Sequence, residues 1–236
     1  MRYRLLLVGM SHTNAIRDAL TQAELPCCAV LNVNAQPALM SEKTQSFDMT
    51  AFPDWRPDVV VLSMSGNTHN VIGLFNHPRP FAIGHPVHGR VPADPDRAFI
   101  PQDAARAFLA QKIAQRFAPF ADLHAHYKGV TFVHLSAPPP VGDEDHIRAN
   151  PGSFAEMLPM GISPPDLRMA LFDLQTDIYA ERAAQHGAAF LLPPRAALTD
   201  TGFLGPGYVA DDPTHGNAAY GRLVLNQIDS LMEKIA

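Results

Sequence analysis

Four polar residues in this sequence have the side-chain types that acyl transfer requires, although they lie far apart along the chain. Ser11 follows an apolar run at the N-terminus, Asn67 follows a second apolar run, and Asp212 and His215 lie near the C-terminus in VADDPTHGNAAYG. An Asp three residues before a His can accept a hydrogen bond from Nδ1 while Nε2 points toward a serine. A nucleophile, a base, an orienting acid and an amide for the oxyanion together form the set that acyl transfer needs.

Apolar runs of strand length alternate with helical patterns along the chain. This alternation indicates the strands and helices that must bring the four residues together. Strands are expected at residues 3–8, 27–33, 57–64, 129–136 and 188–194, and helices at 13–25, 102–127, 163–186 and 217–235. This alternation predicts a doubly wound parallel sheet with helices on both faces, which is a three-layer α/β/α fold. Ligands of such sheets bind at the carboxyl ends of the strands, where Ser11, Asn67 and the 209–221 loop are expected.

Local signals refine this outline. A break is expected at Pro119 inside the second long helical pattern, and Ser163 with Asp166 has capping-box spacing, with Pro164 at the first helical position. Two Pro-rich stretches, residues 75–101 and 137–165, interrupt the alternation. We interpret them as long loops or small insertions at one end of the sheet, so that residues 1–236 are expected to form one domain.

Composition excludes several classes of partner. The net charge is −5 and the pI is near 6.1, so the chain lacks the basic footprint of a nucleic-acid-binding protein and has no Lys/Arg run for an anionic membrane. The apolar run at the N-terminus is too short for a signal-peptide core or a membrane span. Cys27 and Cys28 are adjacent and cannot form a disulfide framework, which fits a reducing compartment. These features predict a cytoplasmic protein.

The four residues and their order resemble the SGNH (GDSL-like) hydrolases, a family of α/β/α esterases and acyltransferases. The matches are Ser11 in VGMSHT, Asn67 in SMSGNTHN, and Asp212 with His215 in DDPTHGNAAYG. The resemblance extends over the whole chain and implies a flavodoxin-like α/β/α fold. It also implies that Ser11 is the nucleophile, His215 the base, Asp212 its orienting acid and Asn67 an oxyanion donor. The backbone N–H of Ser11, at the positive end of the first helix, would be a second donor.

Three departures from the family pattern stand beside these matches. Met10 occupies the position of the acid that usually precedes the serine, and the third block has Ser65 and Thr68 where the family usually has Gly-x-Asn-Asp. Residues 33–51 contain no glycine for the family's second backbone oxyanion contact. A backbone N–H does not require glycine, so another residue can make that contact.

Three of the candidate residues also have ordinary structural interpretations. Ser11 could cap the first helix, and Asn67 beside Gly66 could form a turn. Asp212 before Pro213 suits a helix entry, but that role does not require a histidine three residues later. The joint pattern therefore favours a carboxylic ester hydrolase that forms an acyl-enzyme on Ser11 and acts on small O-acyl groups of a sugar or metabolite. The alternatives are an acyltransferase and a non-catalytic binding protein of the same fold.

No cofactor, metal or macromolecular partner is indicated, so a small-molecule ester is the expected ligand. His124 and His126 are alternate residues that do not share a helix face, which argues against a metal pair. His85 and His88 lie in a Pro-rich loop, where they are expected to line a pocket or face solvent. The sequence gives no indication of the oligomeric state.

Overall fold

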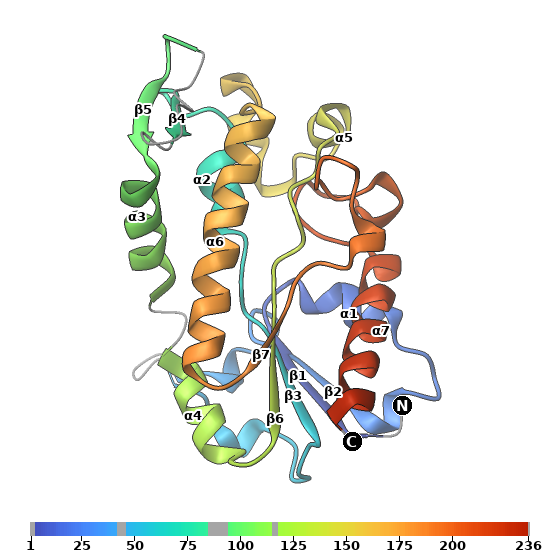
Figure 1. The fold of residues 1–236 in the computed structure, drawn as a ribbon. Helices are drawn as coiled ribbons and strands as arrows, with labels where there is room; N and C mark the ends of the chain where they lie inside the picture. The colour runs from blue at the N-terminus through green and yellow to red at the C-terminus, as the bar shows by residue number, and fades with distance from the viewer. Residues whose placement is uncertain (1–2, 42–45, 85–93, 115–117, 236) are drawn as a thin grey trace.

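The centre of the protein is a five-stranded parallel sheet (Figure 1). The computed structural model describes residues 3–41, 46–84, 94–114 and 118–235. The strand order is β2-β1-β3-β6-β7, with β1 at Leu5–Gly9, β2 at Cys28–Asn32, β3 at Val59–Ser63, β6 at Thr131–Leu135 and β7 at Ala189–Leu191. The direction of winding reverses between β1 and β3, and such a switch point opens a crevice at the carboxyl ends of the strands. The predicted doubly wound parallel sheet is confirmed.

Helices cover both faces of this sheet, and alternate strand residues point into the two layers. In β1, Leu5 and Leu7 belong to one apolar core, whereas Leu6 and Val8 belong to the other. All four side chains are completely buried, as expected for a parallel strand covered on both sides. The first layer contains α1 (Thr13–Ala19) and α7 (Ala218–Ile235), and the second contains α3 (Gln102–Ala114), α4 (Ala118–His126) and α6 (Pro165–Gln185).

The first helix is shorter than predicted, because a residue far along the chain closes it. The pattern indicated a helix over residues 13–25, but α1 ends at Ala19. The Arg222 guanidinium of α7 donates to the Ala19 carbonyl oxygen and also pairs with Glu24 at 2.8 Å. The Ala19 carbonyl at the end of the helix thus has a hydrogen-bond donor, and residues 20–24 are held in a turn. The apolar spacing, which continues past Ala19, could not reveal these contacts with Arg222.

The predicted capping box at the start of α6 is wrong. The N-cap is Pro164, which makes no side-chain cap, and Pro165 is the first helical residue. Ser163 therefore lies outside the helix, and its buried hydroxyl has no partner among the described residues. Asp166 accepts from the adjacent Leu167 N–H instead of reaching back to the cap. Pro165 keeps the preceding Pro164 out of the helical region, with a ψ of 147°, so the helix starts at Pro165 and not at Pro164.

The second long helical pattern contains two described helices, α3, which is described up to Ala114, and α4, which is described from Ala118. The residues between them, 115–117, lie outside the described part of the chain, so the break predicted at Pro119 stays a prediction.

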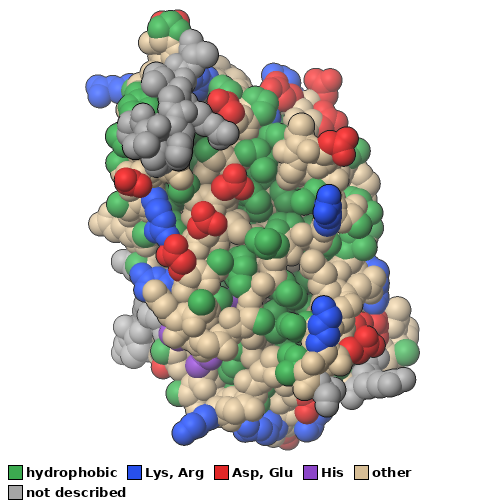
Figure 2. Space-filling view, in the orientation of Figure 1, with side chains coloured by type: hydrophobic (Ala, Val, Ile, Leu, Met, Phe, Trp, Pro, Cys, Tyr) green, Lys and Arg blue, Asp and Glu red, His purple; other side chains and the backbone are tan. Residues whose placement is uncertain are grey.

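Both Pro-rich stretches contain short elements near the carboxyl ends of the strands. The first carries the parallel pair β4 (Phe81–Gly84) and β5 (Ala98–Pro101), and the second carries α5 (Glu144–Ala149) and a 3₁₀ helix at Gly152–Met160. A short helix, α2 (Thr68–Gly73), follows β3 and packs against α6. On the face shown in Figure 2, Lys and Arg side chains are scattered rather than gathered into a basic patch. No helix among the described residues is long and apolar enough to cross a membrane.

Candidate active site

Ser11 lies just beyond the carboxyl end of β1, where the chain turns into α1. Gly9 ends the strand opposite Ser63, and a Cβ at Gly9 would lie 2.4 Å from the Ser63 carbonyl oxygen. Only glycine allows this approach, and the Met10 N–H then donates to the same carbonyl at 3.1 Å. The N-cap of α1 is His12, without a side-chain cap, so the Ser11 hydroxyl is not used to begin the helix.

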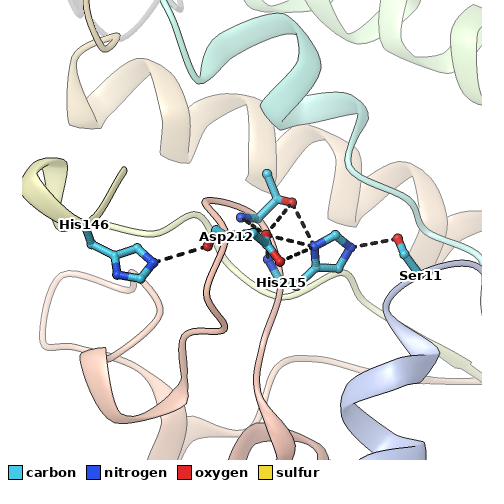
Figure 3. A network of polar contacts seen from close by, with 5 residues as sticks. Ser11, His146, Asp212 and His215 are labelled. Carbon is cyan, nitrogen blue, oxygen red and sulfur yellow. Dashed lines mark hydrogen bonds and ion pairs between the residues drawn. The ribbon is translucent and has the colours of Figure 1, made fainter. Parts of the chain in front are cut away.

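The structure brings Ser11, His215 and Asp212 into one hydrogen-bonded chain, although 204 residues separate the first two (Figure 3). The Ser11 hydroxyl lies 2.7 Å from His215 Nε2, and His215 Nδ1 lies 2.9 and 3.0 Å from the two Asp212 carboxylate oxygens. With its proton on Nδ1, the imidazole donates to the carboxylate and presents a lone pair to the serine. This is the relation between nucleophile, base and orienting acid that serine acyl transfer requires.

The Asp212 carboxylate is held by its own loop as well as by His215. It accepts hydrogen bonds from the backbone N–H groups of Thr214 and His215, at 2.8 and 3.0 Å, and from the Thr214 hydroxyl at 3.1 Å. Burial raises the pKa of Asp212, but the hydrogen bonds from His215 and Thr214 outweigh burial and hold this pKa at about 2. The carboxylate is therefore ionised at neutral pH, and a positive charge that develops on His215 has a fixed counter-charge.

His12 contacts the other side of the catalytic candidate His215, with their ring centroids 4.7 Å apart. Burial, with smaller effects of His215 and His69, lowers the pKa of His12 to about 3. The ring is thus neutral near pH 7 and does not oppose protonation of His215. The contact between His12 and His215 was not predicted, because nothing in the sequence around His12 indicates which distant side chain it packs against.

Asn67 lies at the carboxyl end of β3, in the loop that enters α2. It occupies the N-cap position without making a side-chain cap, and Gly66 before it has a φ of 60°. The structure shows no hydrogen bond between the Asn67 side chain and any described residue. The turn chemistry at this point therefore belongs to Gly66, and the Asn67 amide remains available to a ligand.

The loop after β2 does not supply a free backbone donor near its start. The N–H groups of residues 33–36 all donate within the protein: Val33 to Gly9, Asn34 to the Asn32 side chain, and the next two to the Asn32 carbonyl. By contrast, no described residue accepts a hydrogen bond from the Ser11 N–H. The Ser11 N–H is therefore an unused backbone donor next to the nucleophile, whereas Asn67 is not among the residues that line the cavity beside Ser11.

His146 is a further neighbour of the site that sequence reasoning missed. Its Nε2 lies 3.3 Å from the Asp212 carbonyl oxygen (Figure 3). Its Nδ1 lies 3.4 Å from the Asn150 amide nitrogen. A ring protonated on Nε2 satisfies both contacts, since it donates to the carbonyl and accepts from the amide. The helix α5, from the second Pro-rich stretch, thereby contacts the loop that carries Asp212. A separation of 66 residues left no local pattern from which to predict this contact.

A cavity of about 470 Å³ opens beside the Ser11–His215–Asp212 chain. Its lining includes all three residues, and its other polar side chains are Asn14, Asp18, Asp211 and Asn217. The lining contains no Lys or Arg. The cavity offers hydrogen-bonding groups and negative charge next to the serine, which suits an uncharged polar ligand better than an anion.

The remaining histidines of the described part of the chain do not gather into a metal site. Among the described residues, no group of three or more His, Cys, Asp or Glu side chains could hold a metal ion. His124 stacks on Phe132, with ring centroids 3.7 Å apart, while His126 packs edge-on against Tyr127. His85 and His88 lie outside the described residues.

Known proteins resemble this chain in structure but not in sequence. The sequence matches no protein-family model and no curated protein. A GDSL-like lipase from Bacteroides thetaiotaomicron matches at 13% identity with a TM-score of 0.51, over 99% of this chain and 89% of the lipase. An extracellular lipase from Streptomyces rimosus matches at 15% identity with a TM-score of 0.49, over 95% and 98% of the two chains. The Bacteroides likeness shows that this chain has the three-layer fold of the GDSL-like hydrolases.

Proposed function

We propose that this protein is a serine ester hydrolase in which Ser11, His215 and Asp212 form the catalytic triad. The observation that carries the proposal is the continuous hydrogen-bonded chain from the Ser11 hydroxyl through the imidazole to the carboxylate. The fold of the GDSL-like hydrolases supports the proposal at the level of architecture alone.

The reaction follows from the positions of these groups. Ser11 Oγ attacks the ester carbonyl carbon while His215 Nε2 takes the hydroxyl proton, and the Ser11 N–H and the Asn67 amide donate to the developing oxyanion. The bond to the alcohol oxygen then breaks, and His215 returns the proton to the leaving alcohol. A water molecule, deprotonated by His215, attacks the acyl-serine, which releases the carboxylic acid and restores Ser11.

The cavity supports a small, uncharged polar substrate, such as an O-acyl group on a sugar or metabolite. Asp18 and Asp211 line it together with two asparagines, and no lining cation could bind a phosphate or a carboxylate. We therefore expect neutral esters to be better substrates than anionic esters of the same size.

A panel of esters with acyl chains from acetyl to palmitoyl, assayed with the parent and with Ser11→Ala, tests the proposed function. Removal of the nucleophile is expected to lower kcat by at least about 10³-fold, since only binding and oxyanion effects remain. Ser230→Ala, on the exposed side of α7, is the matched control and is expected to keep full activity.

The same assay separates the alternatives. Equal rates for the parent and Ser11→Ala would overturn the serine mechanism, and a parent that hydrolyses no ester would favour a non-catalytic binding protein. Added alcohols distinguish the acyltransferase, because a transferase would convert them into new esters faster than it releases the free acid.

A further inference from the structure

Gln175 of α6 is completely enclosed beneath the loop that carries Asn67. Its side chain is 1% exposed, and it bonds to that loop on both sides of Asn67. The side-chain oxygen accepts from the His69 N–H at 2.9 Å, and the side-chain nitrogen donates to the Ser65 and Gly66 carbonyl oxygens, each at 3.2 Å. Three backbone groups within five residues thus depend on one amide.

The chemistry of this position requires a carboxamide. One backbone donor and two backbone acceptors face the same side chain, and only Asn and Gln combine an acceptor oxygen with two N–H donors in a neutral group. A glutamate would place negative charge against two carbonyl oxygens, and an apolar side chain would leave three buried backbone groups without partners.

Neighbouring contacts fix the loop relative to α6. Tyr179, one turn beyond Gln175, donates to the Met64 carbonyl oxygen at 3.2 Å. Leu171, one turn before it, packs so closely on α2 that a Cβ at Gly73 would lie 2.2 Å from the leucine Cδ1. Residues four apart share a helix face, so this face of α6 supports the whole segment from the end of β3 to the end of α2.

The direction of the Asn67 side chain depends on the backbone conformation of its loop. That side chain has no hydrogen-bond partner among the described residues, so the loop conformation alone directs it. An oxyanion donor acts only if it is held where the charge develops, and a displacement of about 1 Å is enough to lose most of its effect.

We infer that Gln175 is a positioning residue for the reaction, which acts by holding the loop that presents the Asn67 amide to the oxyanion. This inference rests on the proposed ester hydrolysis. It differs from a purely structural role in one respect: the effect of Gln175 on turnover passes through Asn67 and disappears when Asn67 is removed.

A double-mutant cycle with Gln175→Met and Asn67→Ala tests the inference. Methionine has a similar length without the amide, so Gln175→Met is expected to lower kcat about 10- to 100-fold with KM within about 2-fold. In the Asn67→Ala background the same change is expected to lower kcat less than about 3-fold. Gln185→Met, at the exposed end of α6, is the matched control and should leave kcat unchanged.

Equal losses of kcat in both backgrounds would overturn the inference, as would a folded Gln175→Met protein with the parent's kcat. If Gln175→Met does not fold, Gln175→Asn takes its place in the cycle, because it retains both kinds of polar atom. The NMR signals of the Asn67 side-chain amide give a readout that does not depend on activity. They should shift and broaden in Gln175→Met but not in Gln185→Met, and unchanged signals would contradict the inference. A parent that hydrolyses no ester would refute the proposed function, while these signals would still decide whether Gln175 positions Asn67.

Discussion

Asn67 is the residue on which the proposed chemistry depends most after the triad itself. The structure gives its side chain neither a capping bond nor another partner among the described residues, which removes the simple turn interpretation. The Ser11 N–H is likewise unused, and the start of the loop after β2 offers no free N–H. The oxyanion would therefore have few donors, and each would matter.

Replacement of Asn67 by alanine is expected to lower kcat by about 10²- to 10³-fold, roughly 3–4 kcal/mol, because the amide acts on the charge of the tetrahedral intermediate. KM should change little, since the neutral ester gains less from the amide. Melting temperature and steady-state kinetics are measured on the same preparation. A destabilised Asn67→Ala protein with full kcat per folded molecule would rule out the oxyanion role.

At the level of elements, α1 and α7 together set the distance between Ser11 and His215. The helix α1 begins two residues after the serine, and α7 begins three residues after the histidine. Gly221 lies in their interface, where a Cβ would be 1.9 Å from the Ala15 carbonyl oxygen. The two backbones can approach this closely only because Gly221 has no side chain.

Gly221→Ala is accordingly expected to push α1 away from α7. Overpacking of this kind costs about 1–3 kcal/mol of unfolding free energy, and the longer Ser11–His215 distance should also lower kcat. Gly207→Ala is the matched control, because a Cβ there would meet nothing within 4 Å. Chemical denaturation and turnover of both variants provide the comparison. An unchanged stability and kcat in Gly221→Ala would contradict this account of the helix pair.

The elements also show what could be predicted from the sequence. Strand-length apolar runs and helical spacing located β1, β3, β6 and the long helices. The spacing in the DDPTHG segment, together with the family resemblance, indicated the Asp212–His215 contact. The contacts that no pattern revealed join distant segments: Arg222 closes α1, and Gln175 supports the Asn67 loop over 106 residues. A local pattern reports on neighbours within a few residues, so partners that meet only in the folded chain leave no signal in it.

At the level of the whole molecule, several histidines are buried in the neutral state. Burial lowers the pKa of His12 and His134 to about 3 and that of His69 to about 4, and smaller contributions at the first two come from neighbouring histidines. In the unfolded chain these histidines have a pKa near 6.5. Below that pH they are protonated in the unfolded chain but stay neutral in the folded protein, so the unfolded chain binds more protons. The free energy of unfolding must therefore fall as the pH drops from about 6.5 toward 4.

Three such groups reduce the free energy of unfolding by up to about 4 kcal/mol per pH unit, so a typical stability is lost within about two to four pH units below pH 6.5. We expect acid unfolding with a midpoint below about pH 4.5. His134→Met, away from the candidate site on β6, should move the midpoint to lower pH, because one proton-binding group is removed from the unfolded chain. Circular dichroism against pH measures both proteins, and identical midpoints would contradict a contribution from His134.

Direct observation of the acyl-enzyme tests whether Ser11 carries the acyl group. The parent is mixed with an activated acetyl ester, quenched in acid within the first turnover, digested and analysed by mass spectrometry. We expect one acetyl group on the peptide that contains Ser11, a burst of released alcohol equal to the enzyme concentration, and neither signal in Ser11→Ala. An acetyl group on another residue, or turnover with no covalent intermediate and no loss in Ser11→Ala, would contradict the serine mechanism.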